Sequence, residues 1–144
     1  MFPQSSRTDE RSRQALILLV EDEPFVREAT ESILKSAGFA VLAAADARAA
    51  LTTYAETQEH IELVITDMVL PGCTGQELGR ELRQRSSSIK ILITSGYGTA
   101  ASELEEPARE TYFLAKPYSR RSLVEKVETI LGGVPLACVA RQAG

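Results

Sequence analysis

The chain has 144 residues, of which 44% are hydrophobic and 25% charged, and its formal net charge is −4. This length suits a single domain with a substantial core. The acidic balance, without any dense run of Lys or Arg, argues against nucleic acid as a ligand. Cys73 and Cys138 lie far apart, so neither a zinc site nor a disulfide framework is indicated, which favours a cytoplasmic setting. The apolar run at residues 15–20 is too short to span a membrane, so no membrane contact is expected.

Five segments have the pattern of strands. Residues 1–14 are polar with mixed charges and are interpreted as a flexible lead-in. The first strand is expected at residues 15–20, a continuous apolar run of the kind buried on both faces of a parallel sheet. The other expected strands are residues 39–43, 63–66, 89–94 and a shorter aromatic run at 111–115.

Helical patterns separate and follow these strands. The first begins at Pro24, which suits the first helical position, and stops at Gly38. The N-caps expected for the second, third and fifth helices are Asp46, Thr74 (in a capping box with Glu77) and Ser119. A fourth helix is expected at residues 99–106 and is short because Pro107 limits it.

Strand and helix therefore alternate five times, which predicts an α/β fold of the (βα)5 type. In this fold a doubly wound five-stranded parallel sheet carries helices on both faces, with right-handed crossovers. We expect the domain to occupy residues 15–131. The remaining residues, 132–144, are too few for a second folded domain and are interpreted as a short C-terminal tail.

Polar side chains follow four of the predicted strands. Open α/β sheets bind ligands at the carboxyl ends of their strands, so these residues are the candidates for chemistry. The residues that follow the first, third, fourth and fifth strands are Glu21 and Asp22, Asp67, Ser95, and Lys116. Three acids, a hydroxyl and an ammonium group are thus expected on one edge of the sheet.

The charges of this set indicate a metal-assisted reaction. Three carboxylates placed together repel one another and are tolerable only with a cation between them. Mg²⁺ is favoured because it needs few protein ligands and commonly bridges to phosphate oxygens. With Lys116 and Mg²⁺ beside it, the Asp67 carboxylate is shielded enough to attack phosphorus, and the same charges stabilise the transferring oxygens.

These residues resemble the receiver domains of two-component response regulators over about residues 15–131. The elements that carry the resemblance are the acidic pair Glu21-Asp22, Asp67 followed by Leu70-Pro71 and Gly75, Ser95-Gly96, and Lys116-Pro117. All occur in the order of the family. The resemblance implies the flavodoxin-like strand order 2-1-3-4-5, for which a receiver is itself a standard example.

The resemblance also implies metal and phosphoryl-transfer roles. It makes Asp67 the phosphoacceptor and Asp22 a direct ligand of Mg²⁺. Glu21, which replaces the commoner aspartate, would be a ligand through water, and the backbone carbonyl of Val69 would complete the set. Lys116 would contact the phosphoryl group.

Further roles concern the switch and the lifetime of the phosphate. The resemblance makes Ser95 the switch hydroxyl and Phe113 the switch aromatic, although simple packing fits Phe113 equally well because strands favour aromatics. Side chains two residues after Asp67 and two after Ser95 are best placed to align the hydrolytic water. Here they are Val69 and Tyr97, neither of which is a good base, so slow dephosphorylation is expected.

The predicted function is a phosphorylation switch. The domain accepts a phosphoryl group from a histidine kinase or phosphotransfer protein, and it is not an enzyme apart from its own phosphoryl transfer and autodephosphorylation. It then regulates a protein target through residues 99–106, residues 111–115 and the helix after Ser119. A monomer or a phosphorylation-dependent dimer is expected. The pattern at residues 95–97 is similar to that of receivers attached to or served by hybrid sensor kinases.

Three other functions fit the sequence less well. A phosphohydrolase with an aspartyl-phosphate intermediate needs a second acid two residues after the nucleophile, where Val69 stands. A flavodoxin-like nucleotide-binding protein needs a Gly- or Ser-rich loop where the chain has Glu21-Asp22-Glu23-Pro24. A pseudo-receiver scaffold is expected to lack part of the acid and lysine set. The sequence names neither kinase nor target, and Met1 with the polar lead-in favours a stand-alone regulator over a receiver separated from a hybrid kinase.

Overall fold

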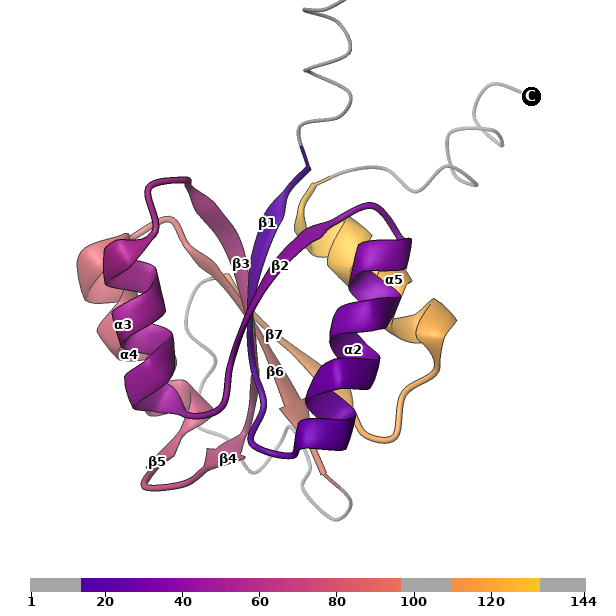
Figure 1. Ribbon diagram of the computed structural model, residues 1–144, viewed down its shortest axis with the longest axis horizontal. Coiled ribbons are helices and arrows are strands. Elements are labelled where there is room, and N and C mark those ends of the chain that lie inside the picture. The colour runs from indigo at the N-terminus through magenta and orange to yellow at the C-terminus, as the bar shows by residue number, and fades with distance from the viewer. Residues whose placement is uncertain (1–13, 97–109, 133–144) are drawn as a thin grey trace, which may run out of the picture.

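In the computed structural model, which describes residues 14–96 and 110–132, five parallel strands form a central sheet with helices on both faces (Figure 1). The strands are β1 (Leu16–Val20), β2 (Ala40–Ala44), β3 (Ile61–Asp67), β6 (Lys90–Ser95) and β7 (Thr111–Ala115). Their order is β2-β1-β3-β6-β7, and all four pairings are parallel. If only the five strands of this sheet are numbered along the chain, the order is 2-1-3-4-5, so the predicted doubly wound α/β fold is confirmed.

Among the described residues, two helices cover each face of the sheet. Helices α2 (Pro24–Ser36) and α5 (Arg120–Ile130) lie on one face, and α3 (Ala47–Glu56) and α4 (Gly75–Arg85) lie on the other (Figure 1). The short fourth helix predicted at residues 99–106 lies outside the described residues. None of the helices in the described part of the chain is long and apolar enough to cross a membrane.

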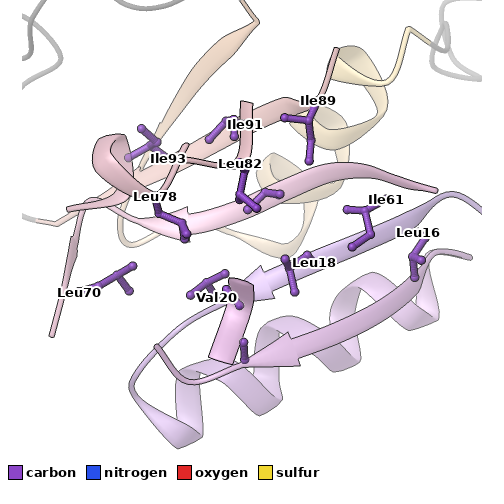
Figure 2. Close-up of a cluster of buried hydrophobic side chains, with 13 residues drawn as sticks. Leu16, Leu18, Val20, Ile61, Leu70, Leu78, Leu82, Ile89, Ile91 and Ile93 are labelled. Carbon is purple, nitrogen blue, oxygen red and sulfur yellow. The ribbon is translucent and has the colours of Figure 1, made fainter. Parts of the chain in front are cut away.

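Alternation of side chains along the strands divides the core into two clusters. In β1, Ile17 and Leu19 pack with α2 and α5, whereas Leu16, Leu18 and Val20 pack with α3 and α4. Figure 2 shows the second cluster, in which Leu78 and Leu82 of α4 lie near Ile91 and Ile93 of β6. Full burial of each such side chain stabilises the fold by roughly 1.5–3 kcal/mol. The continuous apolar runs in the sequence are explained by this burial on both faces.

The third strand is longer than the prediction of residues 63–66. It runs from Ile61 to Asp67, and its pairing with β1 contains a register shift between Leu16 and Ile17. Glu62 lies at this irregularity with its side chain exposed, which interrupts the apolar run in the sequence. At the other end, Asp67 is polar and yet pairs with Thr94 of β6, so the strand extends to the edge of the sheet where the site residues are predicted.

The predicted helix caps are confirmed. The Asp46 carboxylate accepts a hydrogen bond from a backbone N–H in the first turn of α3 at 2.8 Å. Thr74 and Glu77 form the reciprocal capping box of α4, with bonds of 3.0 and 2.9 Å. The Ser119 hydroxyl accepts a backbone N–H of α5 at 3.0 Å. These caps fix where α3, α4 and α5 begin.

A small hairpin between β3 and α4 is not predicted by the sequence pattern. It consists of β4 (Val69–Leu70) and β5 (Cys73–Thr74), paired antiparallel, with Gly72 in the left-handed region at φ 79°. The pattern indicates only a loop here because each strand has only two residues. The hairpin returns the chain toward Asp67, so that α4 begins beside the end of β3 (Figure 1).

Candidate functional site

The predicted site residues meet at the carboxyl ends of β1, β3, β6 and β7. Backbone hydrogen bonds join these strand ends directly: Met68 N–H donates to the Thr94 carbonyl at 2.8 Å, and Lys116 N–H donates to the Ser95 carbonyl at 2.7 Å. Because these bonds belong to the main chain, they hold the site in place whichever side chains it carries. We call this edge of the sheet the acidic rim.

Three carboxylates lie together on the acidic rim. Glu21, Asp22 and Asp67 each offer an oxygen, and these oxygens lie within 4.8 Å of one another. Glu21 and Asp67 are 4% and 8% exposed, whereas Asp22 is exposed. The sequence predicted this convergence, and the structure brings all three residues together.

Lys116 opposes the negative charge of the two buried acids. Its Nζ lies 2.6 Å from Oδ1 of Asp67 and 3.2 Å from Oε1 of Glu21. Burial alone would lower the pKa of Lys116, but its hydrogen bonds to and the charges of Asp67 and Glu21 outweigh burial and raise it. Lys116 therefore remains a cation that faces the phosphoacceptor candidate.

Glu21 is the acid of the rim whose pKa is raised by its surroundings. Burial raises this pKa, and the nearby Asp67 carboxylate raises it further, against the opposing effects of a backbone N–H from Glu23 and the charge of Lys116. The Glu23 N–H donates to Glu21 Oε2 at 3.1 Å. Two carboxylates thus remain in excess over the single lysine, which favours a bound cation.

The donor set fits a small hard cation. All three side chains offer carboxylate oxygens, with no sulfur or imidazole among them, and such ligands suit Mg²⁺ or Ca²⁺ better than a transition metal. Val69, whose carbonyl is predicted to complete the ligands, begins β4 two residues beyond Asp67 with its side chain 72% exposed. The role of the Val69 carbonyl stays a prediction.

The two predicted switch residues lie on the same face of neighbouring strands. Phe113 pairs in register with Ile93, and Ser95 is two residues further along β6 than Ile93. Ser95 is buried, and Phe113 is half-buried against the core cluster of Figure 2. Tyr97, the predicted modulator of dephosphorylation, lies outside the described residues.

An apolar groove of about 590 Å³ adjoins the acidic rim. Helix α2 forms one wall, and Lys116 with the two residues after it forms the other. Phe25 lines the groove and is 83% exposed, which is unusual for a side chain of this size. Any molecule that approaches Lys116 from this side therefore meets apolar surface.

The structure reveals two contacts at the site that the sequence pattern does not predict. The Thr94 hydroxyl donates to Asp67 Oδ1 at 3.0 Å. A Cβ on Gly75 would lie only 2.3 Å from the backbone oxygen of Asp67, so the start of α4 can approach the phosphoacceptor candidate only with glycine there. Both contacts depend on strand register and on the β4–β5 hairpin, which the sequence pattern does not specify.

The fold and this rim define a class of protein. Residues 17–128 match the family model described as "Response regulator receiver domain". The chain therefore belongs to the response regulator receiver domains of two-component systems, as the resemblance implied.

The chain is similar to several individual members of this family. It is 37% identical over 121 residues to the sensor kinase CckA of Brucella abortus, covering 83% of this chain and 13% of the kinase. The crystal structure of the receiver domain of the hybrid histidine kinase CckA has a TM-score of 0.69 and 33% identity, covering 81% of this chain and 99% of that one. The response regulator TrrA of Thermotoga maritima, crystallised with Mg²⁺ and BeF, has a TM-score of 0.71 and 29% identity over the same shares. The chain spans about half the length of two other curated relatives, the transcriptional regulatory proteins SphR and AruR.

Proposed function

We propose that this chain accepts a phosphoryl group on Asp67 from a phosphohistidine of a histidine kinase or phosphotransfer protein, and then regulates a protein target. The observation that carries the proposal is the buried Asp67 carboxylate at the end of β3, which contacts the Lys116 ammonium and adjoins two further acids. A carboxylate without such neighbours would be a poor nucleophile and an expensive group to bury.

In the proposed reaction an oxygen of Asp67 forms a bond to phosphorus as the phosphorus–nitrogen bond of the phosphohistidine breaks. The electron pair of that bond leaves with the imidazole nitrogen, which then takes a proton from solvent. Lys116 stabilises the transferring oxygens, because its ammonium already lies beside Asp67 Oδ1. The product is an aspartyl phosphate.

Glu21, Asp22 and Asp67 would hold Mg²⁺, with Glu21 acting through water and the Val69 carbonyl completing the ligands. When bound, the cation would neutralise the excess negative charge and contact oxygens of the phosphoryl group. The similarity to TrrA, crystallised with Mg²⁺ and BeF, supports this assignment. Removal of the cation is expected to leave the carboxylates of the acidic rim repelling both one another and the incoming phosphate.

The output is proposed to pass from Ser95 to Phe113. When a phosphoryl oxygen accepts a hydrogen bond from the Ser95 hydroxyl, that side chain moves toward the rim and leaves room for Phe113 to turn inward. Their position on one face of adjacent strands supports this route. Strand β7 and helix α5 would then present the altered surface to the target, together with residues 99–106.

Two observations support a phosphorylation switch over a hydrolase. Val69, at the position where a phosphohydrolase places its second acid, has a fully apolar and exposed side chain. The apolar groove beside Lys116 gives a macromolecular donor a surface to contact. Both features favour transfer from a protein donor and a stable product over repeated turnover of small phosphate esters.

The test is phosphorylation of Asp67→Asn beside Asp46→Asn, with a small phosphodonor and with a phosphorylated histidine-containing protein. Asp67→Asn should incorporate no phosphate, because an amide is not a competent nucleophile here. Asp46→Asn is the matched control: asparagine caps a helix as well as aspartate does, and the Asp46 carboxylate caps α3 and is not one of the three clustered acids. Base-labile phosphate in Asp67→Asn, or none in the wild type, would contradict the proposal.

A further inference from the structure

We propose that Thr94 is a positioning residue for the phosphoacceptor, an inference that rests on the proposed function. Its hydroxyl donates to Oδ1 of Asp67 at 3.0 Å, and Lys116 Nζ meets the same oxygen at 2.6 Å. Two donors on one carboxylate oxygen fix the rotation of the carboxyl group about its last bond. Both donors lie on Oδ1, so the other oxygen, Oδ2, would be the one that attacks phosphorus.

The direction of the Thr94 hydroxyl is set by its surroundings. A hydroxyl has a single proton, and the only other acceptor near Thr94 Oγ1 in the described residues is the Thr66 carbonyl at 3.5 Å. The carboxylate is both nearer and charged, so it takes the proton. Thr94 is 3% exposed, which leaves solvent little access to it, and its β-branched side chain has few rotamers.

The backbone of Thr94 contacts the same segment, Asp67 and Met68, that its side chain helps to position. Thr94 pairs with Asp67 in the β3–β6 register, and its carbonyl accepts the N–H of Met68 at 2.8 Å. One residue of β6 therefore constrains both the main chain after Asp67 and the carboxylate of Asp67. In this proposal Thr94 orients the Asp67 carboxylate, and the neighbouring Ser95 serves only as the switch hydroxyl.

A purely structural role for Thr94 makes a different prediction. Threonine suits a strand because of its branched shape, and valine retains that shape while losing the hydroxyl. Serine retains the hydroxyl while losing the buried methyl group. If Thr94 only packs, Thr94→Val should behave like the wild type and Thr94→Ser should be the weaker variant. If Thr94 positions Asp67, the order of reaction rates is reversed.

The first measurement is the phosphorylation rate with a small phosphodonor at saturating Mg²⁺, together with urea unfolding of each variant. Thr94→Val should react about tenfold more slowly than the wild type, the effect of losing one hydrogen bond to a charged group. Thr94→Ser should stay within about twofold of the wild type in rate although it unfolds at a lower urea concentration than Thr94→Val. Equal rates for the wild type and Thr94→Val, or equal slowing in both variants, would overturn the proposal.

The second measurement does not depend on phosphorylation. The ¹³Cγ resonance of Asp67 in the unphosphorylated protein should shift in Thr94→Val and stay near its wild-type position in Thr94→Ser, because it reports the hydrogen bond itself. An unchanged resonance in Thr94→Val would refute the role of Thr94. If instead the wild type took up no phosphate while the resonance shifted as expected, the proposed function would fail and the orienting hydrogen bond would stand.

Discussion

Replacement of Gly75 by alanine tests how closely α4 and the phosphoacceptor are coupled. The new Cβ would lie 2.3 Å from the Asp67 backbone oxygen, 3.1 Å from Thr66 Cγ2 and 3.2 Å from the Asp67 carbonyl carbon. Real Cβ atoms almost never approach closer than 3.0 Å, so the start of α4 and the end of β3 must separate by about 0.7 Å. The obstructing atom belongs to the main chain, so a side-chain rotation cannot relieve the contact.

Two effects are expected from this displacement. Overpacking of this kind destabilises a fold by about 1–3 kcal/mol, measurable as a lower free energy of unfolding in urea. A shift of this size at a nucleophile is expected to slow phosphorylation by about 10- to 100-fold. The rate should be measured with a small phosphodonor at a temperature at which the variant remains folded, so that loss of rate is not loss of folded protein.

Gly79→Ala provides the matched control on the same helix. The three atoms nearest to its Cβ would all belong to the side chain of Ile91, the nearest at 3.4 Å, which is ordinary contact. Alanine inside a helix also gains up to about 1 kcal/mol over glycine, so Gly79→Ala should be at least as stable as the wild type and phosphorylate at the same rate. If Gly75→Ala matched Gly79→Ala in both measurements, the close approach of α4 to Asp67 would have no role in the reaction.

Three further predictions follow from the proposed roles. Asp22→Ala should weaken Mg²⁺ binding and nearly stop phosphorylation, whereas Glu21→Ala should be milder if its contact is through water; equal losses in metal titrations would contradict this order. A phosphoryl mimic should shift backbone amide resonances in β7 and α5 of the wild type and only near the acidic rim in Ser95→Ala; shifts confined to the rim in both proteins would exclude the proposed route. The phosphorylated wild type should lose its phosphate more slowly than the double variant Val69→Asn, Tyr97→Glu, and equal rates in excess Mg²⁺ would show that these side chains do not limit access of water.

The fold could be predicted because its strongest signals are local. β1 and β6 are buried along nearly their whole length, and such strands read as continuous apolar runs. The caps at Asp46, Thr74 and Ser119 need only the residues of one helical turn. Once the five alternations of strand and helix are recognised, the rule that ligands bind at the carboxyl ends of parallel strands is sufficient to predict that the acids and Lys116 lie together.

The remaining features depend on distances that a linear pattern does not encode. The bond from Thr94 to Asp67 follows from the register of β3 against β6, and a change of one residue would turn Thr94 to the other face. The need for glycine at position 75 follows from the β4–β5 hairpin, whose two-residue strands have no periodicity to detect. The extension of β3 to Asp67 is not predicted because a carboxylate ordinarily marks the end of a buried strand.

The charge of the acidic rim is better explained by chemistry than by stability. A buried ion pair is weak support for a fold, because desolvation offsets much of the attraction, and apolar side chains of similar volume would often stabilise the same edge better. Here Glu21 and Asp67 are nearly inaccessible, share one lysine, and stand beside a third acid. Burial raises the pKa of Glu21, and the neighbouring Asp67 carboxylate adds to this rise. A cation would relieve the repulsion among these acids by neutralising them, and a phosphoryl group would give Lys116 a further anionic partner, so that binding of either ligand would stabilise this edge of the folded sheet.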